Sequence, residues 1–164
     1  MENNNTQSLD KVTFAYTYDA VAEVLMADSA YIARSLYDVA AEKPSVASIM
    51  ITEDDEEFVR ANIVTACTDI ITRLVAYVDD DTQFDVEPYT FILGLPSSRR
   101  LAIDSLITHE LLRAISAFVL ARWYESRLPD VAMRQQQLYD AAIAMLRHDV
   151  FMARGKVHRT TTYF

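Results

Sequence analysis

The residues best suited to chemistry are one cysteine, Cys67, and three histidines. A thiol beside an imidazole can act as a nucleophile, and histidines grouped with carboxylates can hold a metal ion. Metal sites in helical bundles use a Glu-x-x-His pattern on two helices, and this sequence contains no Glu-x-x-His. His109 and His148 each adjoin a carboxylate, but neighbours on a helix point to different faces.

We therefore predict no catalytic residue, no metal site and no cofactor, and we expect Cys67 to be a buried apolar residue. A nucleophilic pair of Cys67 with His109 or His148 is the enzyme alternative. The chain also lacks a Gly-x-Ser-x-Gly motif, a Walker loop and a dinucleotide fingerprint. It has 2 glycines and 4 prolines in 164 residues, a composition that favours helices over glycine-rich sandwiches, barrels or phosphate loops.

The net charge of −9 is unevenly distributed along the chain. Residues 1–96 carry 5 Lys and Arg against 18 Asp and Glu, whereas residues 97–164 carry 10 against 6. The first part is therefore at −13 and the last part at +4. Nucleic-acid binding favours a basic domain, so we predict no sequence-specific nucleic-acid partner. The two parts are complementary, and they can pair within one subunit or between subunits in a head-to-tail assembly.

A run of acidic residues at the start of a predicted helix is one candidate interface. The run consists of Glu53, Asp54, Asp55, Glu56 and Glu57. Thr52 with Asp55 resembles a capping box, and carboxylates in a first turn complement the helix dipole. Capping explains part of the run, but five carboxylates are more than a cap needs. A cation or a basic partner is therefore the functional interpretation.

Three arginines and two aromatic residues complete the interface candidates. Arg99 and Arg100 are expected in the first turn of a helix, where cations are unfavourable unless a carboxylate or phosphate faces them. Trp123, Tyr124 and Arg127 end the most apolar predicted helix, and aromatic and arginine residues are favoured binding anchors. A helix that is apolar all round is either the centre of a bundle or lies against a second subunit, so Trp123 fits a core position equally well.

The periodicity of the sequence predicts a mainly α fold, a four-helix-type bundle with one or two short β or extended segments. The expected helices span 19–43, 52–78, 98–127 and 130–154, with Asp19, Thr52 and Ser97 or Ser98 as N-caps. The extended segments span 12–18 and 84–93, and they can pair with each other. The seam of the last helix is expected at Leu138, Ala141, Ala142, Met145, Leu146 and Met152. We expect a disordered tail over 1–11, one domain over 12–155 and a second tail over 156–164.

Three segments resemble small phage or prophage head–tail connector (adaptor) proteins, over about residues 51–155. They are Ile51–Asp55 before a long amphipathic helix, Ala117–Arg127, and Tyr139–Arg147 after a proline-containing turn. The resemblance implies a multi-helix bundle that assembles in a ring and docks on other phage structural proteins. Such proteins work through oligomer and docking surfaces, so the resemblance carries over no catalytic residue.

The leading hypothesis is a non-enzymatic structural or assembly protein of phage or prophage origin that binds itself and other phage structural proteins. The alternative is an intracellular helical binding or regulatory module of unknown ligand, acting through a groove between helices. The N-terminus lacks the pattern of a signal peptide, and the apolar stretches are too short for a membrane span. We therefore expect no membrane partner, and a location in the cytoplasm or in a virion.

Overall fold

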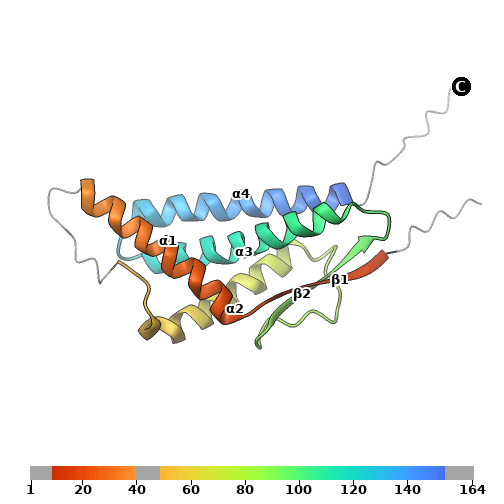
Figure 1. Ribbon diagram of the computed structural model, residues 1–164, viewed down its shortest axis with the longest axis horizontal. Helices are drawn as coiled ribbons and strands as arrows, with labels where there is room; N and C mark the ends of the chain where they lie inside the picture. The colour runs from red at the N-terminus through yellow and green to blue at the C-terminus, as the bar shows by residue number, and fades with distance from the viewer. Residues whose placement is uncertain (1–8, 40–48, 154–164) are drawn as a thin grey trace, which may run out of the picture.

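A computed structural model describes residues 9–39 and 49–153. In chain order these residues form β1 (Leu9–Tyr16), α1 (Tyr18–Val39), the short 3₁₀ helix η2 (Glu53–Asp55), α2 (Glu56–Arg73), β2 (Tyr89–Pro96), α3 (Leu101–Tyr124) and α4 (Pro129–Ala153). α3 and α4 run side by side along the long axis, α1 crosses them obliquely, and the strands lie near α2 (Figure 1). The prediction of a mainly helical fold is confirmed. Residues 1–8 and 156–164 of the expected tails, and the end of the first predicted helix at 40–43, lie outside the described residues. Residues 9–11 were expected in the disordered tail but belong to β1, so the first strand covers 9–16 rather than 12–18.

The two strands pair antiparallel, with Phe14 opposite Phe91 and Tyr16 opposite Tyr89. These four aromatic residues are buried, because alternate residues of each strand point into the core. The predicted pairing is confirmed, but the second strand occupies 89–96 rather than 84–93. Residues on its far side add two single bridges, Val78 to Leu93 and Gln83 to Thr90.

The first helix begins one residue before the expected cap. The backbone N–H of Ala20 donates to Oγ1 of Thr17 at 3.3 Å, so Thr17 occupies the capping position and Asp19 lies in the first turn. There the Asp19 carboxylate complements the helix dipole. The prediction of Asp19 as N-cap is therefore wrong by two residues.

Thr52 caps the 3₁₀ helix η2, as expected of it, but α2 itself begins only at Glu56 and ends early. The backbone N–H of Thr52 donates to Oδ2 of Asp55 at 2.9 Å, which confirms the aspartate form of the capping box. The helix ends at Arg73, not at residue 78, because residues 74–77 turn and Val78 joins β2 instead. Leu74 is fully buried although it lies beyond the end of the helix. The helical spacing of apolar residues in the sequence therefore extends further than the helix itself.

The third helix lies at the centre of the bundle and packs against α1, α2 and α4. It buries 12 of its residues, from Ile107 to Tyr124. Its N-cap is Arg100, not Ser97 or Ser98, and Tyr124 is its last residue rather than Arg127. Of the two positions that the sequence left open for this helix, its burial fits a helix packed within the chain.

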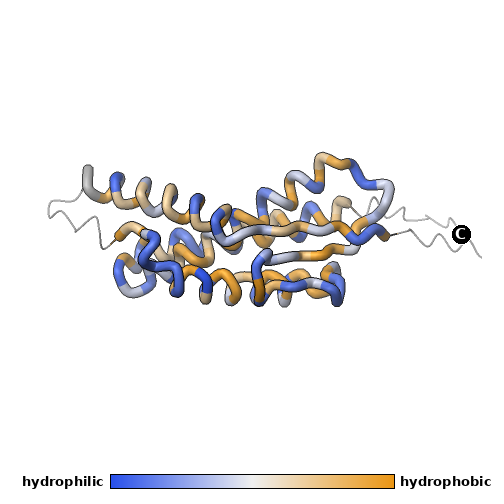
Figure 2. Tube along the Cα trace, turned by 60° about the horizontal axis from the view of Figure 1, so that its bottom comes forward, coloured by the Kyte–Doolittle hydropathy of each residue, from blue (hydrophilic) through white to orange (hydrophobic). Residues whose placement is uncertain are grey.

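The fourth helix, which runs antiparallel to α3, buries a different face from the one expected. Its buried residues are Gln135, Tyr139, Ala142, Ile143, Leu146, Asp149, Val150 and Ala153. Ala141, Met145 and Met152 of the expected seam are exposed instead. Hydrophobic and hydrophilic residues alternate along the helices (Figure 2), and α4 carries more apolar positions than one buried face can take.

Candidate functional site

The acidic cluster lies at the start of α2, and its members differ in their surroundings. Asp55 accepts hydrogen bonds from both the backbone and the hydroxyl of Thr52. Glu56 pairs with Arg60 at 2.6 Å, and Arg60 also reaches Glu87. Asp55 and Glu56 therefore stabilise the fold through contacts within the chain. The other three, Glu53, Asp54 and Glu57, are exposed.

The acidic surface continues onto α1. A groove of about 420 Å³ between the two helix starts is lined by four carboxylates together with Tyr18, Ala22 and Met26. The four acidic residues are Asp19, Glu23, Glu53 and Glu56. Carboxylates from two elements that are distant in sequence thus share one concave face, which spacing along one helix could not show.

Arg99 lies before α3 and is already paired within the chain. Its guanidinium donates to both carboxylate oxygens of Asp104, at 2.7 and 2.9 Å, and to Asp10 at 3.2 Å. The hydrogen bond to Asp104 raises the pKa of Arg99. The facing carboxylate expected from a partner is therefore supplied by the chain itself. Arg100 is exposed at the N-cap of the same helix.

Trp123 and Tyr124 lie in the core rather than on the surface. The indole Nε1 of Trp123 donates to the carbonyl oxygen of Ile49 at 2.8 Å, and the hydroxyl of Tyr124 donates to the same oxygen at 3.2 Å. Burial raises the pKa of Tyr124 to about 12. Arg127 covers the indole ring at 3.9 Å and donates to the backbone oxygen of Trp123. Of these three candidates, only Arg127 is exposed.

The residues first considered for chemistry differ in exposure. Cys67 is fully buried, and burial raises its pKa to about 12, so the thiolate is disfavoured. His109 and His148 are both exposed on α3 and α4. Within the described residues, no three His, Cys, Asp or Glu side chains are grouped closely enough to hold a metal ion.

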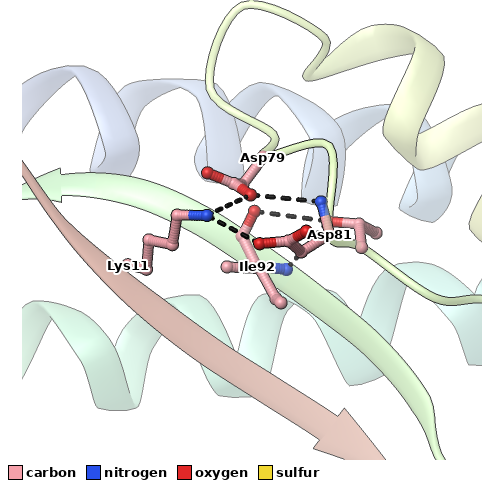
Figure 3. A network of polar contacts seen from close by, with 5 residues as sticks. Lys11, Asp79, Asp81 and Ile92 are labelled. Carbon is pink, nitrogen blue, oxygen red and sulfur yellow. Dashed lines mark hydrogen bonds and ion pairs between the residues drawn. The ribbon is translucent and has the colours of Figure 1, made fainter.

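A polar network joins β1 to the loop after α2 (Figure 3). Lys11 donates to Asp79 at 2.8 Å and to Asp81 at 2.7 Å, and its pKa is raised chiefly by the hydrogen bond to Asp79. The backbone N–H of Asp79 donates to the oxygen of Ile92 at 2.8 Å. The acidic run 79–81 therefore connects the loop after α2 to both strands of the sheet.

Two surfaces that the sequence analysis missed lie on α4. The first is an exposed stripe of Ala141, Ala144, Met145, His148, Phe151 and Met152, spaced as one helix face. The second is a groove between α1 and α4. The excess of apolar positions on α4 was the available signal for the stripe, but spacing alone could not tell which of them is buried.

No protein-family model, curated protein or solved structure matches this chain. Among the described residues, no helix is both long enough and apolar enough to span a bilayer.

Proposed function

We propose that this protein is a non-enzymatic assembly protein of phage or prophage origin, which works by self-association and by docking on other structural proteins. Its site of action is a virion or the cytoplasm in which one is built. The resemblance of 51–155 to head–tail connectors favours this role. The thiol of Cys67 is fully buried whereas His109 and His148 are exposed, which does not favour the enzyme alternative of a cysteine–histidine pair.

One observation carries the proposal: the two oppositely charged parts of the chain remain largely unpaired with each other. Among the described arginines from residue 97 onwards, only Arg99 forms an ion pair with a carboxylate of the acidic part, Asp10. Arg113 and Arg122 pair with carboxylates on or next to their own helix. The charges of both parts can therefore interact with a second molecule. Complementary charges of this kind orient two proteins as they approach each other.

Light scattering over a salt series tests this proposal. At low ionic strength, we expect the protein to have a mass above that of a monomer, and the mass to fall as salt screens exposed charges. Replacing Glu53, Asp54 and Glu57 by lysine should weaken association, because their exposed carboxylates form no ion pair in the described residues. A control variant with Asp80→Lys and Asp85→Lys also reverses exposed acidic charges but leaves the cluster intact. A strict monomer at high concentration in low salt would refute self-association.

A further inference from the structure

The outer side of β1 is an open edge of the sheet. The described strands form a two-stranded sheet, so β1 pairs with β2 on one side only. The far side of β2 is instead covered by the loop after α2, which forms backbone hydrogen bonds with Thr90, Ile92 and Gly94. The described part of the chain therefore covers one edge of the sheet and leaves the edge of β1 open.

The hydrogen bonds of β2 show which backbone groups of β1 are unpaired. Successive residues of a strand direct their backbone groups to opposite sides. Since Ile92 bonds to the loop, its neighbour Phe91 directs its groups toward Phe14 of β1, which lies directly opposite. The alternate residues of β1 therefore direct their N–H and C=O groups away from β2, namely Lys11, Thr13 and Ala15. All three residues are exposed, and no described residue offers these groups a hydrogen bond.

β1 lacks the features that usually protect an open edge. Such edges are protected by prolines, by bulges or by lysines that point outward. The strand LDKVTFAY contains no proline, and its pairing with β2 is continuous, without a bulge. Lys11 extends across the sheet instead, because its ammonium reaches Asp79 and Asp81 in the loop beyond β2 (Figure 3). The edge is therefore open to pairing with another strand.

The two ends of β1 lie near opposite charges. Arg100 is near the start of the strand, because its neighbour Arg99 donates to Asp10 of β1. Arg100 is exposed, and no described carboxylate pairs with it. The acidic groove lies at the other end of the strand, where Tyr18 follows β1 and lines the groove together with Asp19, Glu23, Glu53 and Glu56. The open edge therefore has a cation near its start and carboxylates near its end.

We infer that the open edge of β1 binds the same edge of a second copy, antiparallel, about a two-fold axis at Thr13. The inference rests on the proposed function and specifies a surface for self-association. In this register, the backbone groups of Thr13 pair with Thr13 of the other copy, and those of Lys11 pair with Ala15. Val12 and Phe14, which belong to or pack on the core, lie opposite each other. No like charges lie directly opposite, and the threonine pair is a favourable cross-strand pair.

The antiparallel arrangement also pairs the charges at the two ends. It places Arg100 of each copy near the acidic groove of the other, and the two-fold axis makes this contact twice. Backbone pairing of two short strands is marginal in water, so the charge contacts contribute to stability. Salt, or reversal of Glu53, Asp54 and Glu57, should therefore dissociate the same dimer. The dimer closes on itself and leaves no open edge of β1.

Two substitutions of one residue test the edge by sedimentation velocity at low salt. Thr13→Pro removes an outward N–H that β2 does not use, a position at which edge strands tolerate proline. Thr13→Lys adds the outward charge that protects natural edges. Each should weaken association at least tenfold. Thr68→Lys is the matched control, because Thr68 is exposed on α2, away from the edge. Circular dichroism checks that all three variants fold.

Disulfide crosslinking tests the register. Hydrogen-bonded residues opposite each other in an antiparallel pair have Cα atoms about 5.5 Å apart, which suits a disulfide. Mild oxidation of Thr13→Cys should therefore link two copies. Ala15→Cys is the control, because position 15 lies opposite Lys11 of the other copy and should link much less. The native thiol of Cys67 is fully buried and should not take part. Mass spectrometry of the linked peptides identifies the bond.

The outcomes separate the inference from the proposed function. Loss of association in Thr13→Lys, wild-type behaviour of Thr68→Lys and a disulfide in Thr13→Cys together support the inference. Association of Thr13→Lys at wild-type strength overturns it, as does a Thr13→Cys protein that associates without forming the disulfide. The proposed function stands in both cases if reversal of Glu53, Asp54 and Glu57 still abolishes association. A wild-type protein that stays monomeric overturns both.

Discussion

Replacement of Trp123 and Tyr124 separates a core role from an interface role most clearly. Both side chains donate to one acceptor, the carbonyl oxygen of Ile49, which anchors the segment before η2 to α3. Trp123→Phe removes the shorter hydrogen bond and part of the indole ring. Tyr124→Phe removes only the hydroxyl. In a core role, both variants should lower the free energy of unfolding without changing association.

The magnitudes follow from the two contacts. A lost hydrogen bond costs about 1 kcal/mol, so Tyr124→Phe should cost about 1 kcal/mol. Trp123→Phe should cost about 2 kcal/mol, because it also weakens packing against Phe58, whose ring centroid lies 5.3 Å from that of the indole. In either single variant, the oxygen of Ile49 keeps one donor.

The double variant leaves that buried oxygen without either donor. An unsatisfied buried polar group costs about 1–3 kcal/mol, so the double variant should lose more than the sum of the singles, by about 1 kcal/mol or more. Urea unfolding measures these losses of free energy. It is followed by far-ultraviolet circular dichroism, because the fluorescence of Trp123 is absent from the variants that replace this residue. With a slope of about 2 kcal/mol per molar urea, Trp123→Phe should lower the midpoint by about 1 M.

Tyr31→Phe is the control, because Tyr31 is 75% exposed and should tolerate loss of its hydroxyl. Strict additivity of the two core variants would refute the shared-acceptor argument. Unchanged stability together with lost association would instead place Trp123 in an interface.

Three further predictions concern single contacts. Arg99→Ala should destabilise the fold by about 2 kcal/mol, measured by urea unfolding, because it removes charge-assisted hydrogen bonds that join β1 to the start of α3; a loss below about 0.5 kcal/mol would show that the pair is solvent-screened. Tyr139→Phe should lower stability at neutral pH, because the Tyr139 hydroxyl donates to the Asp69 carboxylate. Burial alone would raise the pKa of Asp69, but hydrogen bonds from Tyr139 and Arg73 outweigh burial and lower that pKa. The stabilisation is therefore present above the ordinary pKa of 3.8 and is lost as the pH falls through the pKa of the folded protein. The difference in stability between wild type and Tyr139→Phe should therefore disappear in acid. Cys67 should resist alkylation at pH 8 in the native protein and react at once in denaturant, and fast native labelling would contradict its burial.

The sequence predicted the helices well, because their signals are local. The mainly helical fold, the capping box of Thr52 and Asp55 and the antiparallel pairing of the extended segments are confirmed. Helix ends were less accurate. The apolar spacing through Leu74 and Val78 continued past the helix, since a buried turn and a bridge to β2 use the same residues.

The candidate surfaces were harder to predict, because they depend on tertiary packing. Arg99 was expected to need a carboxylate or phosphate from a partner. It forms hydrogen bonds with Asp10 and Asp104 of its own chain instead. Tryptophan is common both in cores and in binding sites. The burial of Trp123 and its hydrogen bond to Ile49, which assign it to the core, depend on the tertiary structure. The outward orientation of Met145 and Met152 depends on how α4 is rotated against α3, which local spacing leaves open.

Sedimentation velocity of the wild-type protein beside a variant with Glu53→Lys, Asp54→Lys and Glu57→Lys tests the central claim of self-association most directly. At low salt, the wild-type sedimentation coefficient should rise with protein concentration, while the variant should keep the monomer value over the same range. A wild-type coefficient that stays at the monomer value at every concentration would contradict the claim.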